Sequence, residues 1–463
     1  MSTANNMPAS AWTIATMTGI SVGLVYALSP LTVVFVILIA LVIAWAGRGL
    51  PHDERKWVTA VLLAAVLARV LAVALLFLFT DHSRVPFGSL FGDEEYFIKR
   101  SIWLRNVALG IPIHGADLIY AFDEYSQTSY LYVLAFIQVL VGPSPYGVHL
   151  LGIAFYVMGT IVLYRAVRPA FGRYAAAAGL VLLLALPTLF AWSVSALKDP
   201  LFFLFSTMTV PLGVAIVRSP TWMRKAAAMT ASIGVVAAIE TIRPANGAIV
   251  AAGLVGGLVI SGIARRPRLL IASAVLVPIM AGAVLRLPAA QRQAYGAVQM
   301  AARQHWGHVA TAGYTYKVLD DRLYPDRSSI NDIRFGESMR FLVRAVVSYA
   351  TVPTPWEVQS RSALAYLPEQ LIWYVLLALA PFGVVYGMRH DSVLTGLLVG
   401  NAAVFAISVA LASGNVGTLV RHRGLALPFL VWLSAIGACD LLSWRLTAAR
   451  DRGMTPLAGP VMP

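Results

Sequence analysis

The hydrophobic positions of this chain fall into long continuous runs separated by short polar connections. Most runs approach the roughly 20 residues that an α-helix needs to cross a bilayer, and none alternates as the strands of a membrane barrel do. Because a helix satisfies its own backbone hydrogen bonds in lipid, the pattern predicts an all-α polytopic membrane protein of about 12 transmembrane helices. The runs occupy residues 11–28, 30–47, 57–80, 146–164, 175–193, 200–217, 226–241, 245–263, 269–287, 369–388, 392–412 and 424–443.

The composition agrees with this class of protein. Hydrophobic residues make up 59% of the chain and charged residues 12%, whereas about 25% is usual for charged residues in a soluble domain. The net charge of +14 indicates basic loops and contact with lipid headgroups, and no nucleic-acid partner is expected. With Cys439 as the single cysteine, an intramolecular disulfide is excluded.

The basic residues predict the topology. Arg and Lys gather in alternate connections, which places those connections and both termini in the cytoplasm of a plasma (inner) membrane protein. The apolar run 128–141 is short, and counting it as a span would break this alternation, so we interpret it as a juxtamembrane or re-entrant helix. The prediction is a single membrane domain over 1–443, with external loops at about 81–145 and 288–368, and a cytoplasmic tail over 444–463.

The acidic residues Asp93, Glu94 and Glu95 stand in a row at the start of the first external loop. They open a stretch with a helical apolar stripe, which predicts an interfacial helix. One interpretation is that Asp93 caps this helix and the two glutamates complement its dipole. The other is a carboxylate base at the water–lipid boundary, or a partial ligand set for a divalent cation. The two roles are compatible.

Cationic side chains also lie on the predicted external side. Lys198 precedes a span, where it either extends to the headgroup region or pairs with a lipid phosphate. Arg243 ends a span three residues after Glu240, and this spacing favours a structural ion pair. Arg421 and Arg423 break the positive-inside trend, which indicates that an anion holds them there. The guanidinium fork suits phosphate oxygens, and extension to lipid headgroups is the alternative. The spacing of His305 and His308 is only weakly indicative of a metal site, so the metal ligands stay unknown.

The order of these motifs resembles the GT-C superfamily of membrane glycosyltransferases, which includes protein O-mannosyltransferases and aminoarabinose–lipid A transferases. The resemblance covers about 57–443. Its motifs are Gly92-Asp93-Glu94-Glu95-Tyr96, Tyr130-Leu131-Tyr132, Leu163-Tyr164-Arg165, Ser195-Ala196-Leu197-Lys198-Asp199, and Arg421-His422-Arg423 followed by Leu427-Pro428. The extra acid Glu95, and His422 in place of an aromatic residue, depart from the family pattern.

The resemblance implies an enzyme that moves a sugar from a polyprenyl-phosphate donor to a glycan, lipid or protein acceptor at the external face. Asp93 then matches the loop carboxylate that acts as base, and Glu94 matches the second acid. Lys198, Arg243, Arg421 and Arg423 would bind the lipid phosphate, with a divalent cation as a possible cofactor. Two alternatives stay open: a polymerase or ligase of lipid-linked polysaccharide, and a lipid or polysaccharide transporter.

Overall fold

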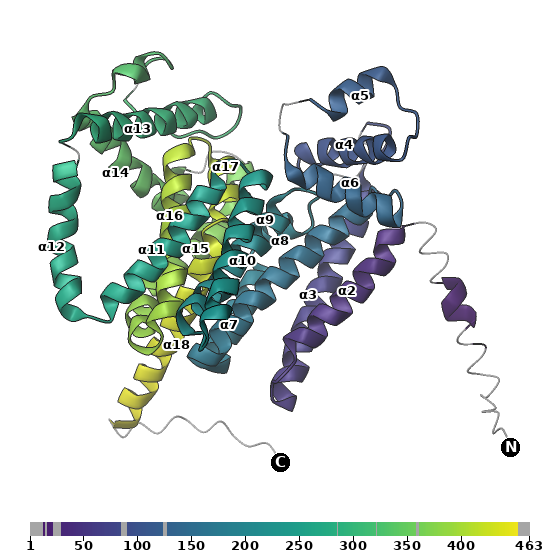
Figure 1. The fold of residues 1–463 in the computed structure, drawn as a ribbon, viewed down its shortest axis with the longest axis horizontal. Coiled ribbons are helices and arrows are strands. Elements are labelled where there is room, and N and C mark those ends of the chain that lie inside the picture. Colours follow the sequence, from purple (N-terminus) through teal and green to yellow (C-terminus); the bar gives the residue numbers. More distant parts are fainter. Residues whose placement is uncertain are drawn as a thin grey trace. The chain divides into compact units, whose positions relative to one another are not determined.

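The computed structural model describes residues 13, 16–21, 29–84, 90–123, 127–284, 286–320, 322–357 and 361–451. These residues form helices, and no strand occurs among them apart from an isolated bridge between Thr315 and Asn415 (Figure 1). The chain divides into two compact units. Unit 1 comprises Met1–Ile161, Phe190–Phe205 and Thr241–Pro244, and unit 2 comprises Val162–Leu189, Ser206–Glu240 and Ala245–Pro463.

Seven helices in the described part of the chain are long and apolar enough to cross a bilayer. A bent pair, α17 (Val416–Arg423) and α18 (Leu427–Asp451), makes an eighth if it forms one span broken by 62°. The protein is therefore an all-α protein of the multi-pass membrane class. The seven are α3 (His52–Phe79), α7 (Gly147–Ala185), α9 (Asp199–Arg218), α10 (Trp222–Ile242), α11 (Asn246–Ala264), α15 (Arg361–His390, through Tyr366–His390) and α16 (Ser392–Ala412).

The expected number of about 12 spans is not shown by these helices, although most of the apolar runs that predicted it are helical. Most of the run 11–28 lies outside the described residues, and the run 30–47 is α2 (Pro30–Ala46), a helix of 17 residues. The runs 146–164 and 175–193 both fall largely in α7. Non-helical backbone at Gly172 (φ 82°, ψ 176°) divides that helix, and Pro169 lies just before the break.

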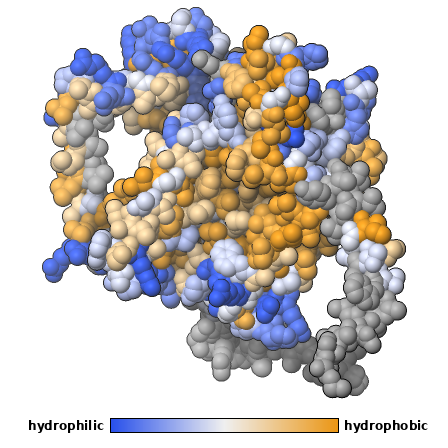
Figure 2. Space-filling model, turned by 45° about the vertical axis from the view of Figure 1, so that its right-hand side comes forward, coloured by the Kyte–Doolittle hydropathy of each residue, from blue (hydrophilic) through white to orange (hydrophobic). Residues whose placement is uncertain are grey.

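Figure 2 shows broad areas of hydrophobic residues on the visible surface, with hydrophilic residues gathered at their margins. The outward side chains of α3 illustrate the cause. Leu67, Leu71 and Phe79 are 66%, 59% and 84% exposed. Large contiguous apolar surfaces are rare on soluble monomers, so these helix faces suit contact with lipid chains.

Unit 1 contains three short helices after α3: α4 (Asp93–Ala108), α5 (Gly115–Ala121) and α6 (Ser129–Val141). Helix α6 has 13 residues and ends at Gly142, which has the positive φ of 109° that glycine tolerates. That length is well below the roughly 20 residues of a full span, so α6 is not one of the candidate spans. Its juxtamembrane or re-entrant position stays a prediction. Its buried face packs on α4 in a core that includes Phe97, Leu104 and Leu134.

In unit 2, two helix pairs approach each other through glycine. A Cβ atom added at Gly257 of α11 would lie 2.7 Å from the Gly396 carbonyl oxygen of α16, and one at Gly400 would lie 2.4 Å from the Gly253 carbonyl oxygen. Helices α15 and α18 meet in the same way at Gly383 and around Gly437. Small residues at such spacings let helix backbones pack closely where lipid supplies no hydrophobic driving force.

The predicted second external loop is a small folded cap in unit 2. Its helices are α13 (Pro288–Val309) and α14 (Phe335–Thr351), with 3₁₀ turns at Ser329–Asp332 and Pro355–Glu357. A compact apolar cluster joins them, built from Ala302, Val318, Tyr324, Ile330, Ile333, Phe341 and Ala345. The remaining helices are α8 (Pro187–Ser193) and α12 (Pro267–Val284).

Candidate functional site

The three acids at the start of α4 lie in different environments. All belong to the first helical turn, where negative charge is stabilised by the helix dipole. Asp93 is exposed, Glu95 forms an ion pair with Lys99 one turn later, and Glu94 is fully buried at 0% exposure. Of the two acids predicted to be catalytic, Asp93 is the one that solvent reaches.

Glu94 fixes the start of α4 to a loop about 100 residues later in the chain. Its Oε1 accepts hydrogen bonds from the backbone N–H groups of Leu90 (3.1 Å) and Phe91 (2.8 Å). Its Oε2 accepts one from the N–H of Ala196 (3.1 Å) and lies 3.5 Å from Nδ1 of His149. Hydrogen bonds to a carboxylate are stronger than those between neutral groups, so Glu94 acts as a brace between the two segments.

Two further buried side chains hold the same loop. The Nδ1–H of His149 donates to the Val194 carbonyl (2.9 Å), because a carbonyl can only accept. The hydroxyl of Tyr130 in α6 donates to the Ala196 carbonyl (3.1 Å). Burial is the main cause that raises the pKa of Tyr130, and the negative charges of Glu94 and Asp199 raise it further. This phenol therefore stays a neutral donor. These two hydrogen bonds hold the backbone that leads to Lys198.

Two cationic residues of unit 1 lie at the end of this loop or contact it. Lys198 is half-buried two residues after Ala196. Arg243 pairs with the next residue, Asp199, at 3.3 Å (Nη1 to Oδ1). The Arg243 side chain stays 21% exposed, and Thr128 donates to the neighbouring Ile242 carbonyl (2.6 Å). Unit 1 therefore gathers the segments that carry Asp93, Lys198 and Arg243, which are far apart in the sequence.

Arg243 pairs with Asp199, whereas Glu240, the ion-pair partner expected from the sequence, binds backbone N–H groups. Its carboxylate accepts the N–H groups of Ala245 (2.8 Å) and Gly247 (2.9 Å), at the start of α11. Ala245 has a positive φ of 67°, which is unfavourable for a residue with a Cβ atom. Glu240 thus stabilises the turn between α10 and α11.

The two predicted phosphate ligands of α17 belong to unit 2. Arg423 is 4% exposed, and its terminal nitrogens donate to Gln370 Oε1 (2.7 Å) and to the carbonyls of Tyr349 and Val352. Its guanidinium also lies over the Trp373 ring, 4.7 Å from the centroid. These contacts engage Arg423 within the protein. Arg421, by contrast, is half-buried.

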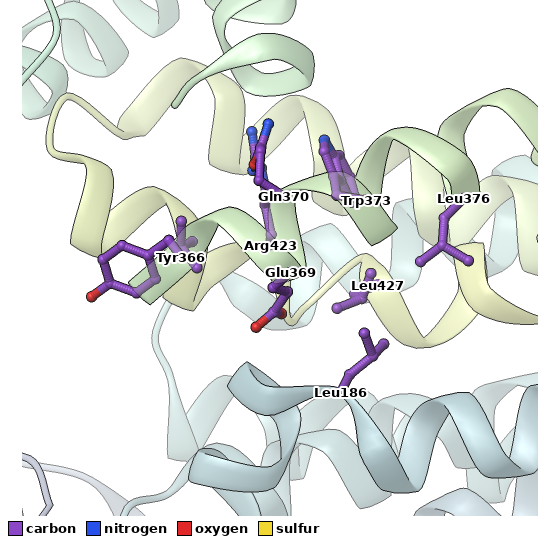
Figure 3. Close-up of a pocket in the computed structure, with 9 residues that line it drawn as sticks. Leu186, Tyr366, Glu369, Gln370, Trp373, Leu376, Arg423 and Leu427 are labelled. Atoms are coloured by element: carbon purple, nitrogen blue, oxygen red, sulfur yellow. The ribbon is translucent and has the colours of Figure 1, made fainter. Parts of the chain in front are cut away.

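A cavity of about 20 Å³ adjoins Arg423 (Figure 3). This volume is sufficient for roughly one water molecule, not for a lipid phosphate. Glu369 lines it, and its carboxylate accepts hydrogen bonds from the N–H (2.9 Å) and hydroxyl (2.8 Å) of Thr188. The full lining is Leu186, Tyr366, Glu369, Gln370, Trp373, Leu376, Val420, Arg423 and Leu427.

The histidines of the cap hold backbone in place. His305 is buried, its Nδ1–H donates to the Ser413 carbonyl, and its Nε2 accepts the N–H of Val318 (3.2 Å). His308 donates to the Ala412 carbonyl (2.7 Å). In the described part of the chain, no group of three or more His, Cys, Asp or Glu side chains is arranged to hold a metal ion.

No family model, curated protein or solved structure matches this chain.

Several residues that organise these sites were not predicted from the sequence. His149 lies inside an apolar run, and Gln370 and Glu369 open another. A polar residue within a predicted span is the signal that could have marked them, since such residues usually face a protein interior. Their partners are distant in sequence, and the pattern alone does not identify those.

Proposed function

We propose that this protein is a glycosyltransferase of the membrane that moves a sugar from a polyprenyl-phosphate donor to an acceptor hydroxyl. One observation supports the proposal: Glu94, the neighbour of the exposed Asp93, binds the loop that leads to Lys198, and Asp199 at the end of that loop pairs with Arg243. A base beside cationic groups is the arrangement that displacement of a phosphate requires.

The proposed reaction is a single displacement with inversion. Asp93 takes the proton from the acceptor hydroxyl as its oxygen forms a bond to the anomeric carbon. The bond from that carbon to the phosphate oxygen breaks, and the electron pair leaves with polyprenyl phosphate. Lys198 and Arg243 stabilise the negative charge that develops on the leaving group.

In this proposal the two neighbouring acids have different roles. Glu94 is buried against three backbone N–H groups, so it positions the helix start that presents Asp93. Asp93, at the exposed face of the same turn, is the catalytic residue.

The proposal also keeps the finer expectations drawn from charge and resemblance. These are a GT-C-like architecture of about 12 spans, an active face on the outer side of a plasma membrane, and a glycan, lipid or protein as acceptor. Arg421 stays a predicted phosphate ligand. The hydrogen bonds of Arg423 favour a structural role for that residue.

The test is transfer from radiolabelled polyprenyl-phosphate sugars in proteoliposomes that contain the purified protein. We expect Asp93→Asn to lower the transfer rate by about 10²–10⁴-fold, the usual contribution of a general base. Glu95→Gln is the matched control and should retain the rate. It changes an acid of the same helical turn and removes an ion pair with Lys99. Equal rates for Asp93→Asn and the unmodified protein would contradict the proposal, and a ladder of products would favour a polymerase.

A further inference from the structure

Helix α14 has a hydrophobic face that the protein does not cover. Its 17 residues extend for about 25 Å at the usual rise of an α-helix. Ser338, Phe341, Ala345 and Tyr349 are buried on one side. On the other side large apolar residues recur every three or four positions and stay 45–62% exposed: Phe335, Met339, Val343, Val346 and Val347.

The C-terminal end of α14 is tied to the first turns of a candidate span, α15. The last carbonyls of a helix have no partner within it. Here the Trp373 indole donates to the Ala350 carbonyl (3.0 Å), and the Gln370 amide (3.2 Å) and the Tyr374 hydroxyl donate to that of Thr351. The apolar part of α15 begins at Tyr366, so these contacts hold the end of α14 beside the first turns of that apolar stretch.

Exposed apolar residues also occur on α15, next to the residues that anchor α14. Leu371 and Val375, in the same turns of α15 as the anchoring residues, are each 56% exposed. Trp356, shortly after the end of α14, is 83% exposed, and tryptophan is enriched where proteins meet the headgroup region. Both helices thus carry exposed apolar residues, and α15 is a candidate membrane span.

Basic side chains border the stripe. Arg340 and Arg344 lie one turn apart on the exposed side of α14. Arg340 pairs with Glu337 (2.7 Å) and its side chain is 65% exposed, and Arg344 donates to the Val318 carbonyl (3.3 Å). An apolar face edged by arginine is the pattern of a helix that lies in the plane of a bilayer surface.

We propose that α14 is a bilayer-binding helix, seated with Met339 and Val343 among the acyl chains and with Arg340 and Arg344 at the phosphate groups of anionic phospholipids. This inference does not depend on the proposed enzymatic function. It assigns a partner, the lipid surface, to the one-sided apolar face of the cap.

The depth of the helix can be measured with nitroxide spin labels in nanodiscs. Cys439→Ala removes the single native cysteine, after which Met339→Cys and Val343→Cys carry the label. Asp332→Cys, an exposed polar position just before α14, is the matched control. We expect the ratio of oxygen to nickel-complex accessibility to be several-fold higher at 339 and 343 than at 332.

Two outcomes would overturn the proposal. Equal ratios at 332, 339 and 343 would place the stripe in water. Exclusion of both reagents from 339 and 343 would show that protein, such as a second copy of the chain, covers it. A labelled variant that does not fold is recognised by its loss of monodisperse elution. The label at the other position then still tests the proposal.

The role of the arginines is tested by lipid composition. Replacing part of the phosphatidylcholine with phosphatidylglycerol should raise the ratio at position 339, and Arg340→Gln should remove most of that gain. Arg327→Gln, at an exposed basic residue outside α14, should leave the gain intact. No response to phosphatidylglycerol, or an equal loss with both variants, would contradict the assignment of the phosphate contact.

Discussion

Asp93 and Glu94 are adjacent in the chain but differ completely in exposure to solvent. The sequence could predict that the cluster of acids opens a helix, because that pattern depends on local spacing. It could not predict which acid is buried, because the burial of Glu94 depends on Ala196 and His149, more than 50 residues away. The resemblance therefore predicted that both acids are catalytic, and it did not show that one of them is buried.

Removing the Glu94 brace should destabilise the protein. Glu94→Ala leaves the N–H groups of Leu90, Phe91 and Ala196 without their acceptor, which we expect to lower the free energy of unfolding by about 2–4 kcal/mol. Thermal unfolding in detergent measures this as a lower apparent melting temperature. Glu95→Ala should produce a clearly smaller change, and equal shifts for the two variants would contradict the brace.

His305 should make stability depend on pH. Burial, opposed by the hydrogen bond to Ser413 and reinforced by His308, lowers the pKa of His305 to about 4 from its ordinary value of 6.5. The unfolded chain therefore takes up this proton first as pH falls, and stability present above about pH 6.5 is progressively lost down to about pH 4, by about 3 kcal/mol in total.

The comparison of melting temperatures at pH 7 and pH 5 checks this prediction. His305→Gln keeps an amide donor and acceptor but does not titrate, so its overall stability should be lower and its dependence on pH weaker than in the unmodified protein. An unchanged dependence on pH in His305→Gln would assign the effect to another group.

At the scale of whole helices, most boundaries followed from the apolar runs. The run 392–412 coincides with α16, and the runs 57–80, 200–217 and 245–263 lie within a few residues of α3, α9 and α11. The thickness of the bilayer sets the length of such runs, so they can be detected in the sequence. Helix α14 was not predicted, because only one of its faces is apolar and a search for continuous runs does not detect it.

The packing of α11 on α16 depends on glycine at specific positions. Gly257→Ala would place a methyl group 2.7 Å from the Gly396 oxygen and the Leu397 Cα atom, whereas Gly256→Ala would meet nothing within 4 Å. We expect the first variant to be destabilised by about 1–3 kcal/mol through overpacking. The second should be neutral or slightly stabilised because alanine favours helix.

Melting temperatures of the two glycine variants, purified in the same detergent, compare adjacent residues of one helix. A loss of stability in Gly256→Ala equal to that in Gly257→Ala would show that the close approach of Gly257 to α16 does not determine the effect.

At the scale of the molecule, several connections that charge patterning assigned to one side of the membrane are in contact within their unit. In unit 2 the predicted cytoplasmic connections meet, since Arg218 pairs with Asp391 and Arg265 donates to the Ser392 hydroxyl (2.7 Å). In unit 1 the predicted external segments meet at Glu94, Asp199 and Arg243. The alternation of basic loops conveys which connections share a side, and the contacts agree with it.

The division into two units was not expected from the sequence. Unit 1 draws on three separate stretches of the chain, and no local pattern reports such long-range grouping. For the same reason the engagement of Arg423 by Gln370, Tyr349 and Val352 was not foreseen. Residue type indicated a phosphate ligand, and the surroundings indicate a structural cation.

The most direct test of the central claim is a cryo-electron microscopy structure of the full chain in nanodiscs with added polyprenyl phosphate. We predict that the lipid phosphate lies against Lys198 and Arg243, within reach of a substrate held by Asp93. A phosphate bound away from these three residues, with Asp93 facing no bound ligand, would contradict the proposed site.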